Sequence, residues 1–231
     1  MSTLSGGPNI VTDGLVMYLD AANQKSYPGS GTAWVDLSGN GNISTLTNGP
    51  TWNSNGWFDF DGVDDQINRG SRNGASFTDT DNMTLSVFLK INNKNVVGVL
   101  GRFTPQASGD GWCVWVNLNK IIFFNTNEFG NYDPAYNNTG YSFTNGEWFH
   151  FAVTRDSVNK TLKWYVNGVL NQEYTTTSSI YRKTNNGISF GHLGNNYYLN
   201  GSIGPCQIYN RALTATEVLQ NFNATRARFG I

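Results

Sequence analysis

Four aspartates fall close together between positions 59 and 65, and they form the densest group of potential metal ligands in the chain. Hard cations such as Ca²⁺ prefer several carboxylate and carbonyl oxygens. Asp61, Asp64 and Asp65, joined by Asp20 from an earlier segment, are therefore our candidate calcium ligands. Asp-Gly and Asp-Asp pairs also form ordinary turns, in which the carboxylate accepts hydrogen bonds from its own backbone. The sequence leaves both interpretations open.

The acidic residues show no pattern typical of catalysis. Glycoside hydrolases place two carboxylates about 5–10 Å apart, and no Glu-x-Asp-x-Glu strand occurs here. The chain has four widely separated glutamates, Glu128, Glu147, Glu173 and Glu217. His150 lies between two phenylalanines in an apolar segment, where we expect a packed histidine, and His192 follows a glycine in a turn. We therefore expect no enzyme, and a glycosidase using Glu128 or Glu147 is the least favoured alternative.

Two loops combine tyrosines with asparagines and aspartates. The first carries Tyr132 and Tyr136, and the second carries Tyr197 and Tyr198. Exposed aromatic rings stack on the faces of sugars, while neighbouring amides and carboxylates bind the hydroxyl groups. These four tyrosines are accordingly our candidate glycan-binding residues. The alternative for each of them is a loop anchor, with the ring buried and the hydroxyl in water.

Composition argues against several classes of partner. Charged residues make up 13% of the chain, and the net charge is −1. Its 15 Lys and Arg residues are scattered, so we expect no basic face for nucleic acid. No apolar run approaches the ~20 residues of a membrane span. The first residues have neither a basic start nor an apolar segment, so we expect no secretory signal.

The two cysteines, Cys113 and Cys206, lie far apart in the sequence. Neither has a CxxC partner or a histidine nearby that would form a zinc site. We expect two buried free thiols that pack as small apolar side chains. A single disulfide that closes a long loop is the alternative.

The elements that must position these residues are β-strands. Trp, Tyr, Phe, Val and Thr are abundant while Glu, Lys and Ala are few, a composition that favours strands and turns. Residues 83–91 alternate between apolar and mainly polar positions, which predicts a half-buried strand. Residues 22–56 contain no convincing strand, and we expect a long, ordered surface loop there.

Several hairpins are predicted from turn chemistry. Residues 111–117 and 121–125 flank a turn at Leu118-Asn119-Lys120, and Asn167-Gly168 separates two alternating runs. Asn-Gly in this setting is among the strongest short hairpin signals. Further strands are expected at 15–19, 57–60, 147–155, 161–166, 169–174, 187–191 and 199–209.

One short helix is predicted near the end of the chain. Thr214 and Glu217 form a capping box, followed by about two turns with one apolar face. Residues 1–14 form a polar, Gly-rich arm suited to threading into a neighbour or staying loose. Residues 15–231 then form a single all-β domain, a jelly-roll sandwich of two antiparallel sheets with one short C-terminal helix.

Six groups of residues carry a resemblance that spans roughly residues 13–229. They are GLVMYLDAAN at 14–23, DLSGNGN at 36–42, FDGVDD at 60–65, WFH at 148–150 with YVNG at 165–168, LNGSIG at 199–204, and IYNRAL at 208–213 followed by TATE at 214–217. Together they resemble laminin-G-like domains of the concanavalin A-like lectin and glucanase superfamily. The resemblance implies a concanavalin A-like jelly roll, and relatives that often carry calcium or act as lectins.

A lone domain of this kind is also similar to structural proteins of tailed bacteriophages, particularly those infecting cyanobacteria. The resemblance thus implies a non-enzymatic virion structural or decoration protein on a capsid or tail surface. Its expected partners are virion proteins, further copies of itself in a homo-oligomer, and cell-surface glycans. The alternative is a free-standing, lectin-like carbohydrate-binding module that reaches the extracellular space by a non-classical route.

Overall fold

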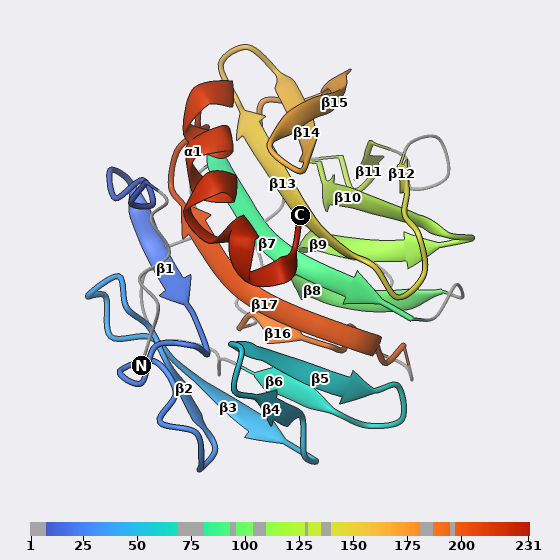
Figure 1. The fold of residues 1–231 in the computed structure, drawn as a ribbon. Helices are drawn as coiled ribbons and strands as arrows, with labels where there is room; N and C mark the ends of the chain where they lie inside the picture. The colour runs from blue at the N-terminus through green and yellow to red at the C-terminus, as the bar shows by residue number, and fades with distance from the viewer. Residues whose placement is uncertain are drawn as a thin grey trace.

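The computed structural model describes residues 8–68, 81–92, 96–103, 110–127, 129–134, 140–180, 187–194 and 197–231. Within them, two antiparallel sheets stack face to face, and a helix lies on the outside of one sheet (Figure 1). The all-β sandwich predicted from the sequence is confirmed. No helix among these residues is long and apolar enough to cross a membrane.

The sheet that carries the helix, sheet A, has the strand order β15-β14-β13-β7-β17-β5-β4, with β1 pairing with β17. Its strands are β15 (Val169–Thr175), β14 (Thr161–Val166), β13 (Trp148–Asp156), β7 (Met83–Ile91), β17 (Asn200–Tyr209), β5 (Trp57–Asp61), β4 (Thr51–Asn53) and β1 (Leu15–Leu19). The central strands β13, β7 and β17 are the longest, and the helix lies over their outer face (Figure 1).

The second sheet, sheet B, has the order β11-β10-β9-β8-β16-β6-β3-β2, with β12 pairing with β10. Its strands are β11 (Tyr132–Asp133), β10 (Lys120–Thr126), β9 (Gly111–Asn117), β8 (Val97–Phe103), β16 (Ser189–Phe190), β6 (Gln66–Asn68), β3 (Ile43–Thr47), β2 (Ala33–Val35) and β12 (Tyr141–Ser142). Part of each sheet is a run of consecutive strands, β15-β14-β13 and β11-β10-β9-β8. The rest pairs strands distant in sequence, such as β7 with β17 and β16 with β6, as in a jelly roll.

Large aromatic side chains join the two sheets in the core. Phe58 of sheet A contacts Trp34 of sheet B at a ring-centroid distance of 5.0 Å, and Trp34 contacts Phe190 at 5.8 Å. All three side chains are fully buried. Tilted and edge-on ring pairs of this kind add to the free energy gained from burial alone.

The segment 22–56 is not the strand-free loop that we predicted. It contains β2, β3 and β4, which are only three to five residues long. Their pairing partners include distant residues, since Leu46 of β3 lies opposite Ile67 of β6. Strands this short leave little local periodicity, so long-range pairing defines them.

Strand β7 is buried on both faces, so the prediction of a half-buried strand was wrong. Helix α1 (Ala215–Thr225) and the 3₁₀ helix η1 (Arg226–Phe229) cover its outer face. The Phe88 ring lies 6.2 Å from the Phe222 ring and 4.5 Å from the Phe229 ring. These helices form a third layer over sheet A, as Figure 1 shows.

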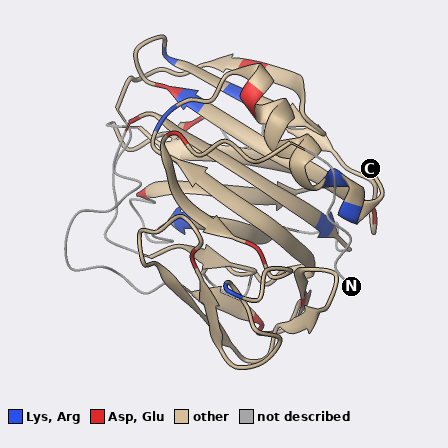
Figure 2. Ribbon diagram, turned by 60° about the vertical axis from the view of Figure 1, so that its left-hand side comes forward, with Lys and Arg blue, Asp and Glu red and all other residues tan. Residues whose placement is uncertain are grey.

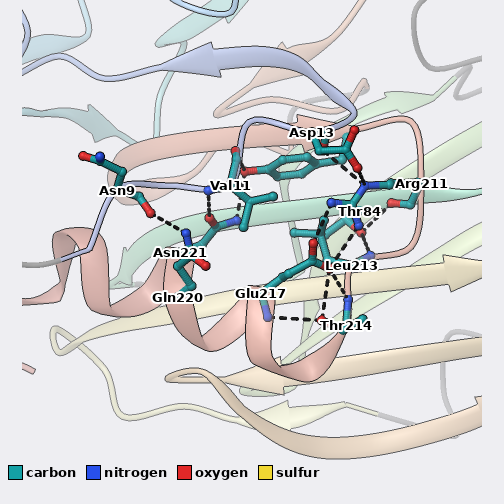
Figure 3. Close-up of polar contacts among 11 residues, drawn as sticks. Asn9, Val11, Asp13, Thr84, Arg211, Leu213, Thr214, Glu217, Gln220 and Asn221 are labelled. Carbon is teal, nitrogen blue, oxygen red and sulfur yellow. Dashed lines mark hydrogen bonds and ion pairs between the residues drawn. The ribbon is translucent and has the colours of Figure 1, made fainter.

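Helix α1 begins at the predicted capping box. The Glu217 amide donates to the Thr214 hydroxyl (3.3 Å), and the Glu217 carboxylate accepts from the Thr214 amide (2.8 Å). The same carboxylate binds the Arg211 guanidinium at 3.0 and 2.6 Å (Figure 3). The Arg211 hydrogen bond lowers the pKa of Glu217 to about 2.

The described part of the N-terminal arm packs on this helix, against the expectation of a loose or threaded arm. The Val11 amide donates to Asn221 Oδ1 at 2.9 Å, and the Val11 carbonyl accepts from the Tyr209 hydroxyl at 2.9 Å. Gln220 Nε2 donates to the Asn9 carbonyl at 2.7 Å, as Figure 3 shows. Residues 9–13 therefore belong to the domain, because a polar network ties them to α1 and β17.

Cys113 and Cys206 are both buried free thiols, as predicted. Cys206 lies opposite Val87 on the core side of sheet A, while Cys113 belongs to β9 in sheet B. Burial raises the pKa of both thiols, which makes them poor nucleophiles at neutral pH.

Candidate functional site

Strand alternation sorts the side chains of sheet B into a core face and an outer face. Phe190 lies opposite Leu100, which lies opposite Val114, and directly paired residues share one face. Because Phe190 contacts the core, Val114 faces the core as well. The neighbouring residues Cys113 and Trp115 of β9 therefore point to the outer face.

An aromatic row runs along this outer face, formed by Tyr132, Phe124, Trp115 and Tyr197. The rings of Phe124 and Tyr132 lie 4.8 Å apart, and those of Trp115 and Tyr197 lie 4.9 Å apart. Phe124 pairs directly with Cys113, so Trp115 is its diagonal neighbour on the same face. Tyr132 and Tyr197, at the two ends of the row, are 40% and 37% exposed.

A compact turn fixes the loop that leads to Tyr132. Asn127 Oδ1 accepts hydrogen bonds from the amides of Phe129 (3.0 Å) and Asn131 (2.9 Å). The Asn127 amide also donates to the Asn131 carbonyl at 2.8 Å. This turn holds the Phe129 side chain in solvent, where it is 72% exposed.

Polar side chains adjoin the Tyr132 end of the row. Asp133 is buried, and its Oδ2 accepts from the Thr177 amide at 2.8 Å and the Thr177 hydroxyl at 2.7 Å. Asn127 Nδ2 also donates to Thr177 Oγ1 at 2.9 Å. Burial raises the pKa of nearby Tyr174, and the Asp133 charge adds to that rise. The Tyr132 end of the row therefore combines exposed rings with hydroxyl, amide and carboxylate groups that hydrogen bonds hold in place.

The four predicted tyrosines have different outcomes. Tyr132 and Tyr197 lie at the two ends of the aromatic row, while Tyr136 falls outside the described residues. Tyr198 stacks on His192, with ring centroids 4.4 Å apart, which is the anchoring role. Burial lowers the pKa of His192.

Three of the four predicted calcium ligands lie together. Carboxylate oxygens of Asp61, Asp64 and Asp65 all fall within 4.8 Å of one another. Asp61 Oδ1 accepts from the amides of Val63 (2.8 Å) and Asp64 (3.4 Å), and Asp65 Oδ2 accepts from the Asp61 amide at 3.0 Å. Burial raises the pKa of Asp65, and the charges of Asp61 and Asp64 oppose its ionisation further. The turn interpretation thus explains the contacts of Asp61.

Asp20 lies apart from this group, which corrects our assignment of it as a fourth ligand. Its two oxygens bind the Arg228 guanidinium at 2.7 and 3.0 Å, and Tyr18 donates to it at 3.1 Å. The Ala22 amide also donates to Asp20 Oδ1 at 3.0 Å. The Asp20 carboxylate therefore ties β1 to η1. Donor chemistry at the remaining three aspartates suits calcium, and the calcium site stays a prediction.

Replacing Asp61 by alanine is expected to destabilise the fold by about 1 kcal/mol, because two turn amides lose their acceptor. Urea unfolding of Asp61→Ala beside Asp64→Ala measures this effect. Asp64 serves as the control, because its carboxylate is exposed and accepts none of these turn bonds. Equal stabilities for the two variants would show that the turn does not depend on Asp61.

The described glutamates lie on separate elements, and Figure 2 shows the Asp and Glu residues scattered over the fold. Glu147 is exposed just before β13, Glu173 pairs with Lys163 at 3.6 Å, and Glu217 caps α1. Glu128 falls outside the described residues. His150 is fully buried as predicted, with Nε2 at 2.8 Å from the Ser86 hydroxyl. Burial lowers the pKa of His150 to about 3.

The structure is thus a β-sandwich of the jelly-roll class, with helices over one outer face and an aromatic row on the other. The chain belongs to the Concanavalin A-like lectin/glucanases superfamily, whose family model matches residues 61–219, more than half of its length. A search of curated protein sequences finds no match.

Solved structures with the same fold include receptor-binding domains of botulinum neurotoxins. The serotype D domain has a TM-score of 0.71 at 16% identity, over 91% of this chain and 52% of that one. The serotype G domain has a TM-score of 0.68 at 18% identity, over 90% and 50%. A serotype D domain in complex with N-acetylneuraminic acid has a TM-score of 0.69 at 19% identity, over 92% and 51%. The chain spans about half the length of these structures, and at such identities the likeness shows the fold alone.

Proposed function

We propose that this protein is a lectin-like module that binds carbohydrate without catalysis, through the outer face of sheet B. The observation that carries the proposal is the aromatic row, whose two end tyrosines keep more than a third of their surface in water. Tyrosines of this kind offer an apolar face and a hydroxyl group together. A neurotoxin domain with the same fold has been solved in complex with N-acetylneuraminic acid, which supports the proposal.

The Tyr132 end of the row has the features that a sugar requires. A pyranose presents one apolar face and a rim of hydroxyls, so it needs a ring to stack on and several hydrogen-bonding groups beside it. Tyr132 and Phe129 supply exposed rings, while Asn131 and Thr177 are exposed polar neighbours. The hydrogen bonds of Asn127 and Asp133 hold these groups in place before any ligand arrives, which reduces the entropy lost on binding.

Removing both end tyrosines is expected to reduce glycan affinity at least tenfold. Tyr132→Ala with Tyr197→Ala removes the two exposed rings, and each lost stacking contact costs roughly 1 kcal/mol or more. Binding of the wild type and the variant to a broad glycan array, followed by calorimetry on the best ligand, measures the change.

Val169→Ala is the matched control, because this 67% exposed side chain lies on β15 of the other sheet. Its affinity should equal that of the wild type. If the double tyrosine variant binds glycans as tightly as the wild type, the aromatic row is not the binding site.

The non-catalytic part of the proposal rests on the positions of the candidate acids and bases. His150 is enclosed between sheet A and α1, and Glu217 is held by Arg211. Incubation with polysaccharides, followed by analysis of released sugars, tests this point. Turnover that disappears in Glu147→Gln would revive the glycosidase alternative.

A virion role remains a prediction from the sequence resemblance alone, together with the partners and homo-oligomer that it implies. Mass spectrometry of purified phage particles tests it directly. Finding the chain at stoichiometric levels would make the module a virion component, and its absence from particles would leave the free-standing module.

A further inference from the structure

A row of four side chains crosses the outer face of sheet A where the helical layer ends. Trp148 pairs with Lys90, Lys90 pairs with Ser202, and Ser202 pairs with Asp59, so the four lie side by side on β13, β7, β17 and β5. Trp57 lies two residues before Asp59 on the same face. Lys90 is the one residue of β7 that is only partly buried.

The charges in this row do not neutralise each other. Asp59 accepts hydrogen bonds from the Ser202 hydroxyl and from Trp57 Nε1 (3.3 Å). The Lys90 ammonium lies instead over two rings, 6.0 Å from the Trp57 centroid and 5.5 Å from the Trp148 centroid. Across the part of the chain that the structure describes, Lys90 forms no ion pair and no hydrogen bond. Its three N–H donors are therefore available to a ligand.

The two tryptophans are fixed in place around this cation. Their rings contact each other at 5.1 Å, and the buried Phe229 ring of η1 lies 4.6 Å from Trp148 and 5.9 Å from Trp57. Both tryptophans stay partly exposed, although Phe229 and Ile231 pack in the same cluster. An ammonium group that lies over two aromatic rings is partly desolvated, and an anion gains more from such a cation than from one in open water.

Exposed amides adjoin the cation on the same face. Asn92 follows Lys90 by two positions, and Asn200 precedes Ser202 by two positions. Asn92 Nδ2 donates to Asn200 Oδ1 at 3.2 Å, and both residues are exposed. Three acids adjoin the same surface: Asp59 in the row, exposed Asp61 opposite Asn200, and exposed Glu147 next to Trp148. No ion pair joins any of them to Lys90, and the Asp59 and Asp61 carboxylates already accept hydrogen bonds from neighbouring groups. This arrangement provides a cation, aromatic walls and amide groups within one surface.

We propose that Lys90, Trp57 and Trp148 form a second subsite, which binds the anionic group of an acidic sugar. A carboxylate or sulfate on the sugar pairs with the Lys90 ammonium, the tryptophans contact the apolar part of the ring, and Asn92 and Asn200 bind hydroxyls. The proposal rests on the carbohydrate-binding function above, but it adds a separate surface on the opposite sheet and a charge preference. Neutral sugars use only the aromatic row of sheet B.

Lys90→Gln is expected to weaken binding of acidic glycans roughly tenfold, the usual loss when a charge-assisted bond to an anion disappears. Binding of neutral glycans should not change. Calorimetry with a neutral, a carboxylated and a sulfated oligosaccharide of matched length separates the two anion types. Lys90→Arg keeps the positive charge and should retain most of the acidic-glycan affinity. Lys25→Gln, an exposed lysine that belongs to neither sheet, is the matched control and should behave as the wild type.

The outcomes separate this subsite from the main function. Weaker binding of either acidic oligosaccharide in Lys90→Gln, with neutral binding intact, supports the subsite and identifies the anion. Unchanged acidic binding in Lys90→Gln, in a protein that still loses affinity through Tyr132→Ala with Tyr197→Ala, overturns the subsite alone. Absence of binding to all three oligosaccharides and to a broad array overturns both proposals.

Discussion

Lowering the pH from 6.5 to 5 is expected to reduce the free energy of unfolding by about 1.6 kcal/mol through His150 alone, with a slope that rises towards about 1.4 kcal/mol per pH unit. The folded-state pKa of His150 is about 3, well below its ordinary value of 6.5, because burial disfavours the charged ring. Between these two pKa values, the His150 ring is therefore protonated in the unfolded chain and neutral in the folded protein. Stability from this group is complete above pH 6.5 and is lost as the pH falls towards 3, by roughly 4 to 5 kcal/mol in total.

Urea unfolding at half-unit pH steps measures this slope. His150→Gln should flatten the curve by about half a proton at pH 6.5 and by nearly one proton at pH 5. His192→Asn is the matched control for the other histidine, whose pKa burial also lowers but whose ring is partly exposed. Glu217 does not interfere, because its stabilisation is lost only below its ordinary pKa of 4.5. A pH slope in His150→Gln equal to that of the wild type would contradict a buried neutral His150.

Asn221→Ala is expected to destabilise the protein by about 2–4 kcal/mol, a large effect for one polar side chain. Asn221 is buried in α1, where it accepts from the Val11 amide and donates to the Tyr209 hydroxyl, both at 2.9 Å. The Tyr209 hydroxyl in turn donates to the Val11 carbonyl. Alanine at position 221 leaves a buried amide and a buried hydroxyl oxygen without partners, and these cannot reach water without releasing residues 9–13.

Chemical denaturation of Asn221→Ala beside Asn223→Ala tests this prediction. Asn223 lies on the same helix and is partly exposed, so the pair controls for the change in helix propensity. A double-mutant cycle with Tyr209→Phe should show a coupling of about 1 kcal/mol or more. Hydrogen exchange at the Val11 amide should speed up in Asn221→Ala. Equal destabilisation by the two asparagine variants would mean that the network does not hold the arm.

Local signals in the sequence predicted local structure well. The capping box at Thr214 begins a helix of eleven residues, longer than the two turns expected. Asn167-Gly168 forms its turn with φ of 50° and 77°, the left-handed values that Asn-Gly favours. The turn after β9 is tighter than predicted: Leu118 and Asn119 have φ of 48° and 67°, and Lys120 already belongs to β10.

Features that depend on distant contacts were missed. Strand β8 contains two glycines, so its strand propensity is low, yet both are required by close packing. A Cβ atom at Gly98 would lie 2.4 Å from the Leu193 Cβ, and one at Gly101 would lie 2.6 Å from the Cys113 Cβ. The alternation in residues 83–91 predicted the strand, but the cover over Phe88 comes from residues more than a hundred positions later. No periodicity within the strand contains that information.

The candidate site was predictable in part for the same reason. Tyrosines in asparagine-rich loops marked Tyr132 and Tyr197, but Phe124 and Trp115 lie between them through strand pairing that alternation alone does not specify. Asp61, Asp64 and Asp65 are neighbours in the sequence and remain neighbours in space. Asp20 instead forms an ion pair with Arg228, which lies more than two hundred positions later in the sequence.

Chemical-shift mapping by NMR tests the central claim, that the outer face of sheet B binds sugar, most directly. Titrating the labelled protein with the best array ligand should shift the amides of Tyr132, Tyr197, Trp115 and Thr177 together, with one common dissociation constant. Amides of β2 and β3, at the far edge of the same sheet, should not move. Saturating ligand that leaves the amides of the aromatic row unshifted, or shifts concentrated elsewhere on the molecule for a neutral sugar, would contradict the account.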